Sequence, residues 1–259
     1  MNATASPAEV SIDTRTLKPG DVYYALRGEQ HDGHDFVEAA LAAGASAAVI
    51  AAHQAARYPP GLAARLRLVP DPLAALQELA RMRRRDWGGP VVAITGSAGK
   101  TTTKEMIAAV LGTRLRVLKS EGNFNNHIGL PLTLLRLEPH HQAAVVEMGM
   151  NHAGELARLA AIAEPTCGVF TNVGEAHLGN FASIEGIAAA KRELALAIPA
   201  SGSLVLNADD PRVAGFAAGF AGQVVFFRGA EFTGELQYPG RHNRANAAAA
   251  AATGALFGV

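Results

Sequence analysis

Short apolar runs alternate with helical patterns along the chain. From residue 91 onward, runs of four or five apolar or small residues are separated by segments with helical spacing. This alternation favours an α/β fold with a mainly parallel sheet and helices on both faces. The strands are predicted at 91–95, 143–147, 167–171, 203–206 and 224–227, and the helices at 101–111, 153–163, 183–198 and 211–219.

The same criterion predicts a smaller α/β unit over residues 1–87. Its strands are expected at 22–25, 47–50 and 66–69, and its first helix is expected at 36–43. A second helix is expected to begin at Asp71-Pro72, because Asp suits the N-cap and Pro the first helical position. The arginines at its end are expected to be solvated; they are Arg81, Arg83, Arg84 and Arg85. Residues 87–90 (WGGP) predict a linker, which places a second domain at 88–259.

Composition and charge narrow the class of protein. The chain has 23 basic and 23 acidic residues, so it has no general attraction to nucleic acid. No apolar run reaches the length of a membrane span, and the N-terminus has no signal-peptide core. The single cysteine, Cys167, excludes an internal disulfide and is expected to be a buried thiol. We therefore expect a cytoplasmic protein.

A glycine-rich turn, TGSAGKT at 95–101, joins the strand at 91–95 to the next helix. Glycines let backbone N–H groups approach an anion, and a helix N-terminus adds positive dipole. Lys100 would then reach phosphates, and the Thr101 hydroxyl would hold magnesium. The turn is shorter than the common P-loop, so an ordinary strand-to-helix turn is the alternative. The expected ATP-binding residues of this segment are Thr95, Gly96, Ser97, Ala98, Gly99, Lys100, Thr101 and Thr102.

Polar clusters follow four of the predicted strands, at 96–101, 147–149, 172–177 and 207–210. Ligands of such sheets bind at the carboxyl ends of the strands, so these clusters predict one active site. Glu147 suits a magnesium ligand, with an N-cap role as the alternative. His177 is either a metal ligand or a structural histidine. Asn123, Asn125 and Asn126 serve either turn chemistry or the orientation of a phosphate or carboxylate.

Lys191 is the most informative single residue of the sequence. It shares a helical stripe with Ile187 and Leu194, so its ammonium group is expected to be buried. Burial lowers the pKa of a lysine and favours the neutral amine. A neutral amine can react with carbon dioxide to give a carbamate, which is a metal-binding anion. The alternative is a lysine whose head group extends past the apolar face to solvent.

Two stretches of the N-terminal unit are too polar for core, at 11–15 and 27–34. The second gathers glycine, arginine and two histidines, and it is either an anion-binding loop or a plain surface loop. Neither stretch has the spacing of a metal site.

Taken together, the chain resembles the Mur ligase family. The matching stretches include SIDTRTLKPGDVYYALRGEQHDGHDF, AITGSAGKTTTKEM, EGNFNNHIGLPLTLL, VVEMGMNHAGEL, TNVGEAHL, AAAKRELA, LNADD and GRHNRANAAAAA. They cover nearly all of the chain in the family's order, and the short P-loop is the family's own variant. Within the family, they are similar to the forms that join D-alanyl-D-alanine to a UDP-N-acetylmuramoyl tripeptide.

The resemblance implies an ATP-dependent ligase of peptidoglycan synthesis that passes through an acyl phosphate. It implies that Lys100, His177 and Lys191 are catalytic, with Lys191 carbamylated. Two magnesium ions would be held by Thr101, Glu147, His177 and Lys191. Asn243 and Asn246 would lie near the adenine. The UDP-linked substrate would contact Thr14, Arg15, Arg27, Gly28, His31, Asp32, Gly33, Asn123, Asn125 and Asn126.

The sequence also departs from the family. The resemblance implies a further C-terminal domain and a longer segment at 232–239, which residues 1–259 do not include, so either parts are missing from this sequence or it is a fragment. We therefore expect the chain to bind ligands without completing catalysis. We also expect it to be a monomer. The rival interpretations are a related Mur ligase, such as the one that adds the third residue of the peptide, a folylpolyglutamate synthase-like ligase, a non-catalytic nucleotide-binding module, and a regulatory fragment that binds a UDP-sugar.

Overall fold

The computed structural model describes residues 9–175, 178–237 and 239–259. The chain is an α/β protein, as predicted, and it divides into two compact units, Met1–Leu79 and Ala80–Val259. Each unit has its own parallel sheet.

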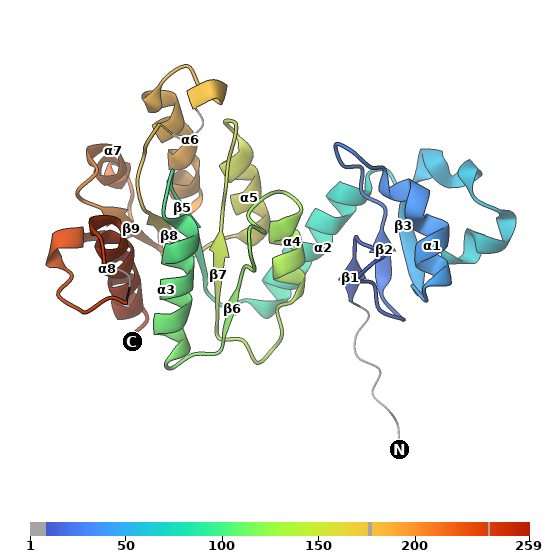
Figure 1. The fold of residues 1–259 in the computed structure, drawn as a ribbon, viewed down its shortest axis with the longest axis horizontal. Helices are drawn as coiled ribbons and strands as arrows, with labels where there is room; N and C mark the ends of the chain where they lie inside the picture. Colours follow the sequence, from blue (N-terminus) through green and yellow to red (C-terminus); the bar gives the residue numbers. More distant parts are fainter. Residues whose placement is uncertain (1–8, 176–177, 238) are drawn as a thin grey trace. The chain divides into compact units, whose positions relative to one another are not determined.

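The N-terminal unit is built on four parallel strands in the order β1-β2-β3-β4 (Figure 1, blue to cyan). Its elements are β1 (Val10–Ser11), β2 (Val22–Tyr24), η1 (Gly33–Phe36), α1 (Val37–Ala42), β3 (Ala47–Ala51), η2 (Ala52–Arg57), η3 (Pro60–Arg65) and β4 (Leu66–Val69). Tyr23, Val37 and Ile50 are central to its core. The two-residue strand β1 was not predicted, because it is too short to show an alternating pattern.

The helix α2 (Pro72–Trp87) begins as predicted, because Asp71 Oδ1 accepts a hydrogen bond from the Leu73 amide at 2.8 Å. The division between the units falls inside this helix, after Leu79, and not in the linker that follows it.

The second half of α2 is fastened to the C-terminal unit by Arg84. Its side chain is buried and donates to the carbonyl oxygens of Ala163 at 2.7 Å and Glu164 at 2.9 Å. Those carbonyls close the helix α5 (Glu155–Ala163). The expectation that Arg84 is solvated is therefore wrong: the guanidinium group donates to carbonyls at a helix end, which have no partner within the helix.

Six parallel strands form the sheet of the C-terminal unit, in the order β10-β9-β8-β5-β7-β6. They are β5 (Val91–Thr95), β6 (Val117–Lys119), β7 (Ala143–Glu147), β8 (Cys167–Phe170), β9 (Ser203–Asn207) and β10 (Gln223–Phe227). Every residue of β5, β7 and β8 is buried, which is why these strands are apolar or small up to Thr95 and Glu147 at the ends of β5 and β7.

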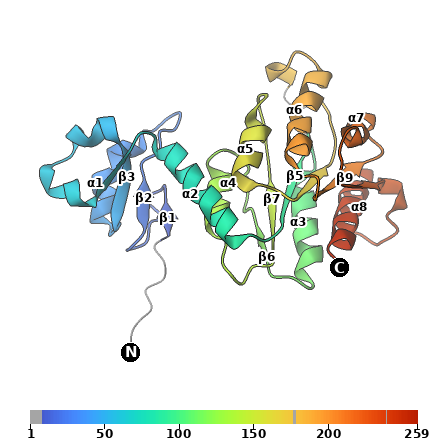
Figure 2. The ribbon, with the colours of Figure 1, turned by 180° about the vertical axis from the view of Figure 1, so that it is seen from behind.

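Helices cover both faces of this sheet (Figures 1 and 2). On one face, α3 (Lys100–Gly112) and α8 (Arg241–Leu256) pack around Ile94 and Leu111. The opposite face is covered by α5 together with α4 (Gly129–Leu135), α6 (Ile184–Ala197) and α7 (Pro211–Ala214). In the described part of the chain, no helix has the length and apolar character needed to cross a bilayer.

Several details differ from the predictions for physical reasons. β6 is a three-residue strand at the sheet edge, and α4 begins directly after a polar loop, so neither gave a clear periodic signal. The helix predicted at 211–219 ends at Ala214 and continues only as a 3-10 turn. Cys167 is buried as predicted, and burial raises the pKa of its thiol to about 12.

Candidate functional site

The turn between β5 and α3 is a tight loop that only glycine fits at two positions. Gly99 has φ +82°, and a Cβ there would lie 2.6 Å from Asn246 Oδ1. A Cβ on Gly96 would lie 1.8 Å from Thr171 Oγ1. The loop therefore passes closely between the end of β8 and the helix α8, and its shape follows from these two glycines.

Residues that follow β8 hold this loop in place. Asn172 Oδ1 accepts from the Ala98 amide at 2.9 Å, and Asn172 Nδ2 donates to the Ala98 carbonyl at 3.0 Å. Ser97 Oγ donates to the Gly174 carbonyl at 3.0 Å and accepts from the Gly174 amide at 2.9 Å. The polar cluster predicted at 172–177 thus supports the glycine-rich loop, although Asn172 was not singled out from the sequence.

Lys100 begins α3 and folds back over the loop. Its Nζ donates to the Gly96 carbonyl at 3.0 Å. Burial lowers the pKa of this lysine, and the nearby negative charge of Glu147 acts in the opposite direction. The ammonium group therefore sits at the helix N-terminus, where a bound anion would meet both its charge and the helix dipole.

Thr101 and Glu147 are in direct contact at the carboxyl edge of the sheet. Thr101 Oγ1 donates to Glu147 Oε2 at 2.7 Å, and Glu147 is 2% exposed. Its other oxygen accepts from Asn125 Nδ2 at 2.8 Å. The N-cap alternative for Glu147 is wrong, because the helix that follows β7 begins only at Glu155.

The three asparagines before α4 divide between the two roles considered for them. Asn125 contacts Glu147, so it belongs to the polar site. Asn126 Oδ1 accepts from the Ile128 and Gly129 amides, at 3.1 and 2.9 Å, which is turn chemistry at the start of α4. The Asn123 carbonyl accepts from the Asn125 amide.

Lys191 is buried in α6, as its position on the apolar stripe predicted. It is 2% exposed, so the alternative in which its head group reaches solvent is wrong. Burial, together with the positive charge of Lys100, lowers its pKa to about 7. At neutral pH much of this lysine is therefore a free amine, which is the nucleophilic form.

Other predicted residues lie in different surroundings. Asn246 is buried in α8 beneath the glycine-rich loop, where its Oδ1 accepts from Thr103 Oγ1 at 3.1 Å. Asn243 is half-buried near the start of the same helix. Contact of either residue with adenine stays a prediction. His177 lies outside the described residues.

The polar stretch at 11–15 forms a turn around Asp13 in the N-terminal unit. The Asp13 carboxylate accepts from the Arg15 amide at 2.9 Å and pairs with its guanidinium group at 2.6 Å. The side-chain hydrogen bond from Arg15 lowers the pKa of Asp13 to about 2. Thr14 is half-buried and Arg15 is exposed in this turn.

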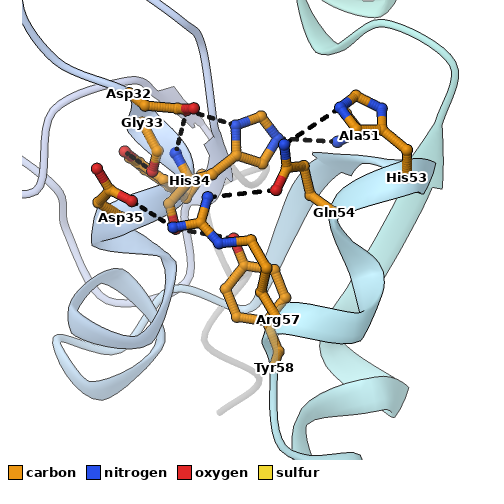
Figure 3. Close-up of polar contacts among 10 residues, drawn as sticks. Asp32, Gly33, His34, Asp35, Ala51, His53, Gln54, Arg57 and Tyr58 are labelled. Atoms are coloured by element: carbon orange, nitrogen blue, oxygen red, sulfur yellow. Dashed lines mark hydrogen bonds and ion pairs between the residues drawn. The ribbon is translucent and has the colours of Figure 1, made fainter.

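The stretch at 27–34 is a hairpin-like loop that ends at the buried His34. Figure 3 shows the polar contacts of His34. Arg27 pairs with Asp32 through the backbone, and the Gly28 amide donates to the His31 carbonyl. His34 Nε2 accepts from the Ala51 amide at 3.0 Å, so Nδ1 carries the hydrogen that it shares with Asp32 Oδ1 at 2.6 Å.

Gly33 is enclosed in this loop, because a Cβ there would lie 2.6 Å from the Leu26 carbonyl oxygen. Arg27, Gly28 and His31 are exposed at the loop tip. The base of the loop is thus packed closely around Gly33, and the exposed tip is open to solvent. A role of the tip in anion binding stays a prediction. Within the described residues, no three His, Cys, Asp or Glu side chains gather as a metal site.

A glycine-rich loop at the carboxyl edge of a parallel α/β sheet, with Lys and Thr opening the next helix, defines a P-loop type of nucleotide-binding fold. The comparisons with known families agree with this class. The Mur ligase middle domain matches residues 94–228, and the Mur ligase family catalytic domain matches residues 8–84. The chain therefore belongs to the Mur ligase family.

The relatives narrow the resemblance further. The UDP-N-acetylmuramoyl-tripeptide--D-alanyl-D-alanine ligase of Bacillus subtilis is 40% identical over 96% of this chain and 59% of its own length. A crystal structure of MurF from Acinetobacter baumannii matches with TM-score 0.86 and 31% identity, over all of this chain and 62% of the other. MurF ligase from Thermotoga maritima, in complex with ADP, matches with TM-score 0.76 and 33% identity, over 85% and 50%. The chain thus spans about 60% of the Bacillus relative's length.

Proposed function

We propose that this chain acts in an ATP-dependent amide ligase that adds D-alanyl-D-alanine to a UDP-N-acetylmuramoyl tripeptide in peptidoglycan synthesis. The observation that carries the proposal is the contact of Thr101 with Glu147 beside Lys100, in a glycine-rich loop. The names of the relatives and the ADP complex of one of them support it.

The donor set at Thr101 and Glu147 fits magnesium. Mg²⁺ prefers oxygen ligands and usually takes one or two carboxylates together with substrate phosphates and water. A buried carboxylate beside a hydroxyl meets this need, and Asn125 orients the carboxylate through its other oxygen. Bound there, the ion would neutralise charge on the phosphates. His177 and Lys191 are proposed for a second magnesium ion.

The proposed reaction has two steps. The terminal carboxylate of the tripeptide attacks the γ-phosphorus of ATP, which breaks the bond to the bridging oxygen and releases ADP. Lys100 stabilises the negative charge of the transferred phosphoryl group. The amine of D-alanyl-D-alanine then attacks the acyl phosphate, so an amide forms, inorganic phosphate leaves, and the amine loses a proton.

Lys191 is proposed to be carbamylated. Its neutral amine would form an N–C bond with carbon dioxide and release one proton to water, leaving a carbamate. The support is burial together with a pKa lowered to about 7 by desolvation and by Lys100. Lys191→Ala is expected to be nearly inactive and to be partly rescued by small carboxylic acids. Full activity of the alanine variant would overturn the proposal, as would density for a plain ammonium in a crystal grown with bicarbonate and ATP.

The N-terminal unit is proposed to hold the UDP part of the substrate, through the turn at 14–15 and the loop at 27–33. The match of residues 8–84 to a Mur ligase domain supports this over a folylpolyglutamate synthase-like ligase. The C-terminal end of the loop is held by two tyrosines. The hydroxyl of Tyr23 donates to the Gly33 carbonyl, and that of Tyr58 donates to the His34 carbonyl. We further propose that the protein is a cytoplasmic monomer.

The test is phosphate release from ATP by the full coding sequence that contains this chain. Release that requires both the UDP-muramoyl tripeptide and D-alanyl-D-alanine is expected. Release without either substrate would favour a different nucleotide-dependent activity. A thermal shift of the 259-residue chain with each ligand separately distinguishes a nucleotide-binding module, which responds to ATP alone, from a UDP-sugar-binding fragment, which responds to the UDP compound alone.

A further inference from the structure

Lys104 is a buried lysine with no part in the chemistry proposed above. It lies one turn beyond Lys100 on α3, on the stripe shared with Ile107 and Leu111, and its side chain is 0% exposed. An ammonium group taken out of water needs partners, because an unpaired buried charge is strongly unfavourable. The partners of Lys104 therefore indicate what the residue does.

Among the described residues, the Lys104 ammonium group contacts Glu105 and the Gly122 carbonyl, which lies in a loop further along the chain. Its Nζ lies 3.1 Å from Glu105 Oε1 and donates to the Gly122 carbonyl at 3.5 Å. Glu105 also pairs with Lys119, at the end of β6. Lys104 thus joins the first turns of α3 to residues 120–126, here called the asparagine loop.

The asparagine loop in turn holds Glu147. Ser120 Oγ accepts from the Glu147 amide at 3.3 Å, and Asn125 Nδ2 donates to Glu147 Oε1 at 2.8 Å. The Asn125 carbonyl accepts from the Gly149 amide at 2.8 Å. Movement of the loop would release the carboxylate on the side opposite Thr101.

We infer that Lys104 is a positioning residue: its buried ammonium group fastens the asparagine loop to α3 and so places Asn125 against Glu147. This inference goes beyond the proposed function, and its magnesium readout below rests on that function. It predicts that removal of the charge loosens a loop whose own residues are unchanged.

The primary test is hydrogen–deuterium exchange on the ligand-free 259-residue chain. In Lys104→Met, the amides of residues 121–126 and of Gly149 are expected to exchange at least tenfold faster than in wild type. Amides of β8 serve as an internal reference and should not change. Lys104→Arg, which keeps a charged donor, should restore most of the protection. Wild-type exchange in the asparagine loop of Lys104→Met would overturn the inference.

Lys119→Met is the matched control, because this exposed lysine pairs with the same carboxylate of Glu105. It should leave exchange at 121–126 and Gly149 unchanged, and equal loosening by both variants would assign the effect to Glu105 instead. If Lys104→Met unfolds, Lys104→Gln is used, since it removes the charge but keeps a donor. Wild-type protection of the loop in Lys104→Gln, with Lys104→Met unfolded, would reduce Lys104 to a stability role and overturn the inference.

A second readout is the magnesium dependence of ADP binding. Lys104→Met and Asn125→Ala should each weaken binding of Mg²⁺·ADP about tenfold, with ADP alone unaffected, and the double variant should be no weaker than either. Effects that multiply would contradict the shared path. If wild type itself shows no magnesium-dependent binding, the proposed function fails, while the exchange experiment still decides the role of Lys104.

Discussion

The Thr101 hydroxyl lies 2.7 Å from Oε2 of Glu147, and this contact joins the first turn of α3 to the end of β7. The two residues are distant in sequence, but the parallel order of β5 and β7 brings their carboxyl ends to the same edge. A carboxylate buried there is preorganised, so nucleotide and metal would meet a site that already has its shape.

Replacement of Glu147 should separate metal binding from nucleotide binding. Glu147→Gln keeps the shape and the contact with Asn125 but removes the negative charge. Affinity for Mg²⁺·ADP should fall about 10- to 100-fold, with affinity for ADP without magnesium retained. Isothermal titration calorimetry with ADP, in the presence and in the absence of magnesium, measures both affinities. Glu138→Gln, at an exposed position, is the control, and an unchanged magnesium dependence in Glu147→Gln would remove Glu147 from the metal site.

Removal of the Lys100 charge should abolish most of the ligation. Lys100→Ala is expected to lower the rate by at least ~10³-fold, the scale of a lost contact to the developing charge of the transition state. Phosphate release by the full coding sequence measures the effect. Lys119→Ala removes an exposed lysine of the same unit and should be near wild type. Near-normal activity of Lys100→Ala would exclude Lys100 from the mechanism.

The lowered pKa of Lys191 predicts a pH-dependent stability. Below pH 7 the lysine is charged in both the folded and unfolded chain, and the folded state carries the full cost of the buried charge. Between about 7 and the ordinary lysine pKa of 10.5, the folded state has lost the proton that the unfolded state keeps, so this cost falls as pH rises.

Lys191→Met should therefore raise the free energy of unfolding, and the gain should be largest at pH 6, on the order of a few kcal/mol. The gain should shrink steadily between pH 7 and 10. Denaturant unfolding in CO₂-free buffer measures it. A gain that is constant with pH would show that the lysine does not change its protonation in this range.

Gly99→Ala should distort the glycine-rich loop for two separable reasons. The φ of +82° is unfavourable for any side chain, and the new methyl group would meet Asn246 Oδ1 at 2.6 Å. A loss of about 1–3 kcal/mol of stability is expected. Asn246→Ala in the same chain should recover part of it by relieving the contact. Gly112→Ala, with nothing within 4 Å of the new methyl group, is the control and should be neutral or stabilising.

Arg84 should contribute more to stability than its neighbour Arg83. Arg84→Ala leaves the carbonyl oxygens of Ala163 and Glu164 without their donor, and a loss of about 1–3 kcal/mol is expected. Arg83→Ala, at an exposed position of the same helix, should stay within about 0.5 kcal/mol. Equal losses in the two variants would mean that the two buried contacts contribute nothing.

Much of the fold was predictable because local patterns and tertiary environment agree. The buried strands β5, β7 and β8 are apolar except for Thr95 and Glu147 at their carboxyl ends, and the buried Lys191 stood out on an apolar helical stripe. Lys104 also lies on an apolar helical stripe, with Ile107 and Leu111, but its position directly after the glycine-rich motif did not single it out from the sequence.

The roles of individual polar residues were less predictable, because they depend on contacts distant in sequence. Arg84 lies at a helix end, where arginines are usually solvated, and only the position of α5 makes it a buried donor. Asn125 and Asn126 are neighbours with equal intrinsic chemistry, yet one reaches Glu147 and the other holds the turn that precedes α4. No local pattern distinguishes them.

The position of Asn246 beneath Gly99 affects the order in which parts of the protein fold during synthesis. The glycine-rich loop leaves the ribosome early, but five further strands of the same sheet are made before the helix that supports the loop, Arg241–Leu256. Contacts between such distant segments form late and slowly in folding. A nascent chain arrested before residue 241 should therefore expose an unformed loop, and nucleotide binding should arise abruptly once α8 has emerged.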